Sequence, residues 1–149
     1  MEFRKANQKD IHNLVTLRKT QLIDEGIEPN QDIDEELYQF FNKKLQDGSL
    51  IQWIVVEKDS IIATGAIIFY DFPPSFTNKS GRKGYLSNMY TKAEYRGQGI
   101  ATKLLDTLVK EAQDADVSKL WLGASTLGKP VYKKFGFNES NEWMELSLT

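Results

Sequence analysis

Two glycines, Gly97 and Gly99, stand where an apolar, strand-like run ends and a helical pattern begins. The upstream run covers residues 85–91. The apolar residues downstream recur at helical spacing: Ile100, Ala101, Leu104, Leu105, Leu108, Val109 and Ala112. Glycines leave the backbone bare, and the first N–H groups of a helix have no partner within it, so such a turn binds anions, most often phosphate. The spacing therefore predicts a phosphate-binding turn ahead of the helix.

Two common phosphate loops do not fit this turn. A P-loop needs Gly, four residues, then Gly-Lys-Ser/Thr, and the position counted from Gly97 is occupied by Thr102. The dinucleotide pattern needs a small residue at the same position and fails there as well. What remains is Arg96-x-x-Gly99-x-Ala101. A general nucleotide-binding domain, with affinity for ATP or NAD, stays open as an alternative.

The composition argues against several other functions. The net charge is −2, and the basic residues are scattered apart from the 79–83 group, which disfavours nucleic-acid binding. The absence of cysteine excludes disulfides, thiolate metal ligands and a cysteine nucleophile. The one histidine, His12, falls in a predicted surface helix without partners, so we expect no metal site. The N-terminus lacks the apolar core of a signal peptide, and no apolar run approaches ~18 residues. We therefore expect a cytoplasmic protein that does not bind membranes.

Strand and helix patterns alternate around these residues, and one domain over residues 1–149 accounts for them. Asn7 or Asp10 would cap the first helix, Gly48 would end the second, and a polar loop would run from Pro73 through Gly84. In chain order we expect a strand at 3–6, helices at 11–22 and 33–45, a hairpin of strands at 50–57 and 61–70, a strand at 85–91, a helix at 100–112, a strand at 119–124, a short helix at 130–135 and a final strand at 143–148.

A second motif, Tyr132-Lys133-Lys134-Phe135-Gly136-Phe137, follows the strand expected at 119–124. The two motifs, in this order, resemble those of the GNAT N-acetyltransferases, an acyl-CoA-dependent family whose patterns are Q/R-x-x-G-x-G/A and Y-x-K-x-G-F. The order of elements resembles that family over nearly the whole chain. The resemblance implies an α/β fold with a central mixed, mostly antiparallel sheet, a splayed strand pair and about four flanking helices.

The resemblance also implies acetyl-CoA as the cosubstrate, with no metal. In this family the strand before the glycine motif splays from its neighbour, and the pantetheine arm fills the gap like an extra strand. Carried over to this sequence, that arm would pair with the backbone of Met89, Tyr90 and Thr91. The pyrophosphate would lie beside Arg96 and Gly97, on the N–H groups of Gln98, Gly99, Ile100, Ala101 and Thr102.

Tyr132 is the residue to which the resemblance assigns chemistry. A thiolate leaves when an amine attacks the thioester, and a nearby phenol can donate a proton to it. The alternative is that Tyr132 only packs on the sheet. The family's asparagine contact to the pantetheine arm is replaced by Ser125, with Thr126 beside it.

The glutamate base that many family members carry on the splayed strand is missing, because residues 85–93 contain no carboxylate. Asp71, Glu25 or Glu28 could act instead through a water chain, although each is also a reasonable surface acid. Seven acids follow the first predicted helix: Asp24, Glu25, Glu28, Asp32, Asp34, Glu35 and Glu36. They could select a cationic acceptor, but helix capping and solvation is the favoured explanation.

The expected function is transfer of an acetyl group from acetyl-CoA to a primary amine. The absence of cysteine excludes a cysteine acyl-enzyme, and the resemblance to the family implies direct transfer in a ternary complex. The expected partner is a small-molecule or peptide amine, and a homodimer is left open. A non-catalytic acyl-CoA sensor is the alternative function, supported by the missing glutamate and opposed by the retained Tyr132.

Overall fold

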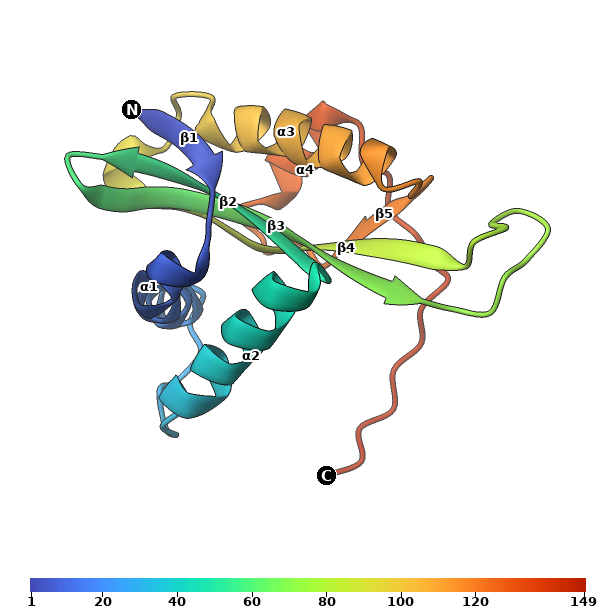
Figure 1. Cartoon of the computed structure of the whole chain (residues 1–149), viewed down its shortest axis with the longest axis horizontal. Coiled ribbons are helices and arrows are strands. Elements are labelled where there is room, and N and C mark those ends of the chain that lie inside the picture. The colour runs from blue at the N-terminus through green and yellow to red at the C-terminus, as the bar shows by residue number, and fades with distance from the viewer.

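The computed structural model describes residues 1–149 and consists of a five-stranded sheet with helices on both faces (Figure 1). Its elements are β1 (Glu2–Lys5), α1 (Ile11–Asp24), α2 (Asp34–Asp47), β2 (Leu50–Glu57), β3 (Ser60–Asp71), β4 (Arg82–Thr91), α3 (Ile100–Asp114), β5 (Leu120–Leu122) and α4 (Lys129–Phe135). The strands lie in chain order across the sheet. Neighbours from β1 to β4 are antiparallel, whereas β4 and β5 are parallel. The mixed, mostly antiparallel sheet and the four helices confirm the expected fold.

The helices lie on both faces of the sheet, α1 and α2 on one and α3 on the other (Figure 1), and each face carries its own apolar core. On one face, α1 and α2 pack through Leu14 and Phe41 against Ile54 of β2. On the other face, α3 packs through Leu105 and Leu108 against β3 and β4. All three helices have apolar residues at helical spacing, which is why the sequence pattern located them correctly. No helix has the length and continuous apolarity that a membrane crossing requires.

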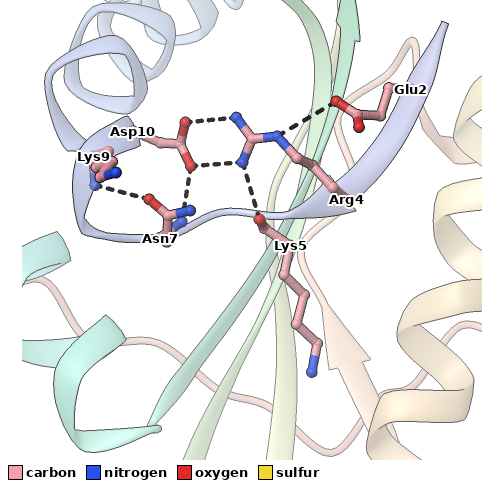
Figure 2. A network of polar contacts seen from close by, with 6 residues as sticks. All are labelled: Glu2, Arg4, Lys5, Asn7, Lys9 and Asp10. Carbon is pink, nitrogen blue, oxygen red and sulfur yellow. Dashed lines mark hydrogen bonds and ion pairs between the residues drawn. The ribbon is translucent and has the colours of Figure 1, made fainter.

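A polar network fixes the start of α1 to β1 (Figure 2). The guanidinium of Arg4 donates two hydrogen bonds to the carboxylate of Asp10, both of 2.9 Å. The same carboxylate accepts the N–H of Asn7, whose side chain accepts the N–H of Lys9. Asn7 and Asp10 therefore form a capping box at the short 3-10 turn of Gln8–Asp10, which leads directly into α1. The bonded guanidinium, opposed in part by burial, lowers the pKa of Asp10.

Local signals also explain both ends of α2. Asp32 accepts the N–H of Asp34 at the start of the helix, and Asp34 forms an ion pair of 2.6 Å with Lys19 of α1. Gly48 ends the helix with a φ of 80°, a left-handed conformation that favours glycine. These contacts account for two of the seven acids without any ligand.

Two expectations about strands were wrong. β4 begins at Arg82, so residues 82–84, expected in the loop, belong to the sheet and pair with Asp71, Tyr70 and Phe69. The expected strand at 143–148 does not form, because residues 136–149 contain no helix or strand. Figure 1 shows this C-terminal tail leaving the body of the molecule in extended form.

Candidate active site

The sheet opens at the middle of β4. The pairing of β4 with β5 covers only Gly84–Leu86 and Leu120–Leu122, so the rest of β4 has no neighbour on that side. The register between β3 and β4 shifts here, with Thr64 opposite Tyr90 but Ala66 opposite Ser87. One extra residue is thus present on β4, and a bulge of this kind bends a strand and increases its twist. The bulge explains the splay that the family resemblance implied.

Asn88 and Gly65 make the bulge possible. Asn88 is buried and has a φ of 55°, a left-handed conformation that asparagine tolerates better than most residues. Its side-chain amide lies 3.5 Å from Oε1 of Gln52, which in turn donates a 2.9 Å hydrogen bond to Thr64. A Cβ at Gly65 would lie only 2.5 Å from the sulfur of Met89, so glycine leaves the space that this side chain fills.

The N-terminus of α3 presents free donors. Its hydrogen-bond ladder begins with the N–H of Lys103 donating to the carbonyl of Gly99 at 3.1 Å. None of the N–H groups of residues 98–102 donates to a backbone or side-chain acceptor. Gly97 and Gly99 have φ values of 80° and 79°, and nothing lies within 4 Å of the position that a Cβ would take. The turn thus exposes a concentrated set of N–H groups to an anion.

A cleft of about 610 Å³ runs from this turn along the open side of β4. It is bordered by seven of the residues expected to bind the cofactor or act in catalysis: Met89, Tyr90, Thr91, Arg96, Ala101, Ser125 and Tyr132. Gly97, Gln98, Gly99, Ile100 and Thr102 lie in the same turn but do not border this cleft. Their role in binding therefore stays a prediction based on the free N–H groups.

Arg96 is held in place at the mouth of the cleft. Its Nε donates a 2.8 Å hydrogen bond to the carbonyl of Thr91, and its guanidinium lies 5.7 Å from the ring centre of Tyr90. The two terminal nitrogens have no acceptor on the protein. They are available to an anionic ligand, and the contact of Arg96 with the pyrophosphate stays a prediction.

Tyr132 lies on α4, where the cleft meets a second one. Its ring packs edge-on against Phe137, with centroids 5.9 Å apart. A Cβ at Gly128 would lie 2.9 Å from this ring, so glycine one turn earlier makes room for it. Burial, followed by the charges of Glu25 and Tyr85, raises the pKa of Tyr132 to about 12. The phenol therefore keeps its proton at neutral pH and can act as a donor.

Ser125 borders the cleft but also has a structural contact. Its Oγ accepts the N–H of Gly128 at 3.1 Å, at the turn that leads into α4. The hydroxyl proton is still free for a ligand, because an –OH group donates and accepts independently. The cofactor contact of Ser125 stays a prediction, and Thr126 lies beside it on the same cleft.

The second cleft, of about 340 Å³, lies on the other side of Tyr132. Glu25 borders both clefts and is the only one of the three proposed bases to do so. Neither Glu28 nor Asp71 borders either cleft. Of the seven acids between residues 24 and 36, only Asp24 and Glu25 contribute to these walls. The structure thus favours helix capping and solvation for the others, as the sequence suggested.

Sequence reasoning missed the contacts between α1 and the splayed strand. Gln21 donates a 3.1 Å hydrogen bond to the carbonyl of Met89 and a 3.2 Å one to Oε1 of Glu25. The hydroxyl of Tyr90 donates to Asp24, and burial together with this bond raises the pKa of Tyr90 to about 12. Gln21 and Met89 lie 68 residues apart in the chain, and Asp24 and Tyr90 lie 66 apart, so no local pattern identifies these two pairs.

Solved structures resemble this fold closely. A crystal structure from Clostridium acetobutylicum, described as a predicted acetyltransferase with acetyl-CoA, is 58% identical with a TM-score of 0.96. The alignment covers 99% of this chain and 96% of that one, so it includes nearly all of the C-terminal tail. An N-acetyltransferase from Ralstonia eutropha is 19% identical with a TM-score of 0.85, over 99% of each chain, and supports the fold alone.

Curated relatives match a shorter part of the chain. A bovine thialysine N-epsilon-acetyltransferase is 35% identical over 71 residues, and the porcine enzyme is 33% identical over 70. The matched part is 46% of this chain and 42% of the bovine protein, so the chain spans less than half the length of that relative. The model of the acetyltransferase (GNAT) family matches residues 11–137. With that match over most of its length, and with a splayed strand leading into a glycine turn, this chain belongs to the acetyltransferase (GNAT) family.

Proposed function

We propose that the protein moves the acetyl group of acetyl-CoA directly to a primary amine bound in the second cleft. The observation that carries this proposal is the meeting of two clefts at Tyr132 and Glu25. The larger cleft joins the free N–H groups of the glycine turn to the open backbone of β4, which suits a long ligand with a phosphate at one end. The smaller cleft offers a separate entrance for the acceptor.

The chemistry needs one proton acceptor and one proton donor. The amine attacks the acyl carbon only after it has lost a proton, because an ammonium group has no lone pair. Glu25 accepts that proton, directly or through a water molecule, at the junction of the clefts. As the new C–N bond forms, the C–S bond breaks, and the phenol of Tyr132 gives its proton to the leaving thiolate. The proton balance is restored when solvent reprotonates Tyr132 and takes the proton of Glu25.

The second cleft has mixed charge, which bears on the acceptor. Arg18 and Glu25 both border it, so a cation is not selected by an acidic wall alone. An amine that also carries an anionic group would find a partner for each charge. The bovine and porcine relatives are named for an amino acid with a side-chain amine, which belongs to this class. We therefore place amino acids with a side-chain amine first among candidate acceptors.

The test follows release of CoA from acetyl-CoA with a thiol reagent, across amino acids, polyamines, aminoglycosides and peptides. The chain has no cysteine, so every thiol that appears comes from CoA. Release that depends on one class of amine supports the proposed function. Tight acetyl-CoA binding without release for any amine would instead favour the acyl-CoA sensor. A melting temperature raised by ATP or NAD, but not by acetyl-CoA, would contradict both.

A further inference from the structure

Gln21 is a polar side chain on the buried face of α1. It is 5% exposed, and the other buried residues of that helix are all apolar: Ile11, Leu14, Val15 and Leu17. An apolar residue of the same length would continue this row, whereas burying an amide costs free energy unless the amide is hydrogen-bonded. Gln21 borders the second cleft but not the larger one. Its hydrogen bonds therefore bear on the proposed acceptor site.

Two acceptors fix the orientation of the Gln21 amide. Its nitrogen, Nε2, donates to the main-chain carbonyl of Met89 at 3.1 Å and to Oε1 of Glu25 at 3.2 Å. A carbonyl and an ionised carboxylate only accept hydrogen bonds, so the reverse orientation would place the oxygen of Gln21 against two other oxygens. The amide therefore has one orientation, and both of its N–H groups are bonded within the protein.

The side-chain oxygen of Gln21 has no donor on the protein. Both hydrogen bonds of this side chain leave from its nitrogen, and none ends on its oxygen. The oxygen is not enclosed either, because no enclosed side-chain nitrogen or oxygen in the structure lacks a partner. Of the two clefts that meet at Tyr132, Gln21 borders the second. A fixed acceptor thus opens into the proposed acceptor cleft.

A primary amine needs more than one acceptor to be oriented. Its ammonium form has three N–H donors, so a single carboxylate leaves the group free to rotate. Glu25 supplies one acceptor at the junction of the clefts, and Gln21 lies one turn earlier on the same face of α1. Two fixed acceptors hold the nitrogen in one direction, which removes part of the entropic cost of the reaction. An alcohol has one O–H and could satisfy only one of them, so the pair favours amines.

We propose that the side-chain oxygen of Gln21 accepts an N–H of the acceptor amine and orients its nitrogen beside Glu25 for attack on the acetyl group. This assignment rests on the proposed function and adds to it a residue that touches the acceptor. No bond forms or breaks at Gln21, because the amide neither gives nor takes a proton. The hydrogen bond to Met89 joins the same amide to β4, so the amine is oriented relative to the strand along which the larger cleft runs.

Two substitutions separate the oxygen of this side chain from its nitrogen. Gln21→Met keeps the length of the side chain and has neither group, whereas Gln21→Glu keeps an oxygen and loses the donors to Met89 and Glu25. For Gln21→Met we expect kcat/KM for the amine to fall by about 10–100-fold, the range for one hydrogen bond to a charged group. Gln21→Glu should stay within about 3-fold of the parent, because an oxygen still meets the amine. If Gln21 only held α1 against β4, the two variants would lose the same activity, since both lack the donors.

The probe is the amine that gives the fastest release of CoA among lysine, spermidine, kanamycin and a peptide with one lysine. Gln39→Met is the matched control, because Gln39 also donates to a glutamate one turn earlier, Glu35, at 2.9 Å, but lies exposed on α2 outside both clefts. It should keep the kcat/KM of the parent. Circular dichroism and melting temperature establish that each variant folds, and Gln21→Leu replaces Gln21→Met if the latter does not.

The outcomes separate this assignment from the proposed function. Equal losses in Gln21→Met and Gln21→Glu, or no loss in Gln21→Met, overturn the assignment and leave acetyl transfer to the amine in place. A loss of about 10-fold or more in Gln21→Glu overturns it as well, whatever the other variant does. A parent that releases no CoA with any of the four amines contradicts the proposed function, and the assignment with it.

Discussion

Glu25, at the end of α1, and Tyr132, on α4, border the same two clefts and are linked electrostatically. Burial first, and then the charge of Glu25, raises the pKa of Tyr132 to about 12. The carboxylate thus has two effects in the proposed reaction. It accepts the amine proton, and it helps keep the phenol protonated until the thiolate leaves.

The first prediction concerns Tyr132→Phe. The change keeps the ring beside Phe137 but removes the donor, so turnover should fall by about 10–10³ while acetyl-CoA affinity and melting temperature barely change. The deficit should shrink as the pH approaches the thiol pKa of roughly 8–9, where the thiolate needs no proton. Since the pKa of Tyr132 is about 12, its own titration does not enter this range. Full turnover of the variant at pH 7 would return Tyr132 to a packing role.

The second prediction concerns the base. Glu25→Gln keeps the size of the side chain and a carbonyl oxygen that can accept the hydrogen bond from Gln21, but it cannot take a proton. Turnover should fall by about 10²–10⁴ with little change in acetyl-CoA affinity. Glu28→Gln is the matched control, because it removes the same charge nearby at an exposed residue outside both clefts. Equal turnover of the two variants would remove Glu25 from the mechanism.

The third prediction concerns the glycine turn. Gly99→Val should weaken acetyl-CoA binding by about 10–100-fold, because a side chain there would displace the pyrophosphate from one or two N–H groups. The φ of 79° also strains any other residue, so the fold should lose about 1–3 kcal/mol.

Gly48→Val separates strain from binding. Gly48 has a φ of 80°, and, as at Gly99, nothing lies within 4 Å of the position that a Cβ would take. It lies at the end of α2, far along the chain from the glycine turn. It should lower the melting temperature to a similar degree while leaving affinity for acetyl-CoA, measured by calorimetry, at the parent value. Unimpaired binding by Gly99→Val would show that the pyrophosphate lies elsewhere.

The fourth prediction concerns stability in acid. The Arg4 guanidinium lowers the pKa of Asp10 in the folded protein, so the pair stabilises the fold above the ordinary carboxyl pKa of about 3.9. This contribution should disappear as the pH falls through the lowered, folded-state pKa. Asp10→Asn should cost about 1–3 kcal/mol at pH 7 and less at pH 2, measured by urea unfolding. Glu2→Gln, which touches Arg4 at 3.7 Å, should have little effect at either pH.

The sequence predicted best those elements whose causes are local. The end of α2 at Gly48 and the start of α3 at the glycine turn were both predicted, because a few adjacent residues determine each of these helix ends. The position of Glu25 relative to Tyr132 could not be predicted, since it depends on how α1 packs against β4 through Gln21 and Met89. The tail was assigned to a strand for the right reason, its alternation, but a strand also needs an edge to pair with. In this structure residues 144–148 pair with no strand.

The one-residue shift in register at Asn88 has a consequence for how the length of this chain can vary. Deleting Asn88 would place Met89 opposite Gly65 and leave Tyr90 opposite Thr64, so the later residues of β4 would keep their partners on β3. The strand would lose the bulge, and with it the bend and the added twist next to the cleft. The loop at 72–81 carries no such constraint, because its ends are already joined across the sheet by Asp71 and Arg82. Natural relatives should therefore differ in length at the loop and keep the extra residue of β4.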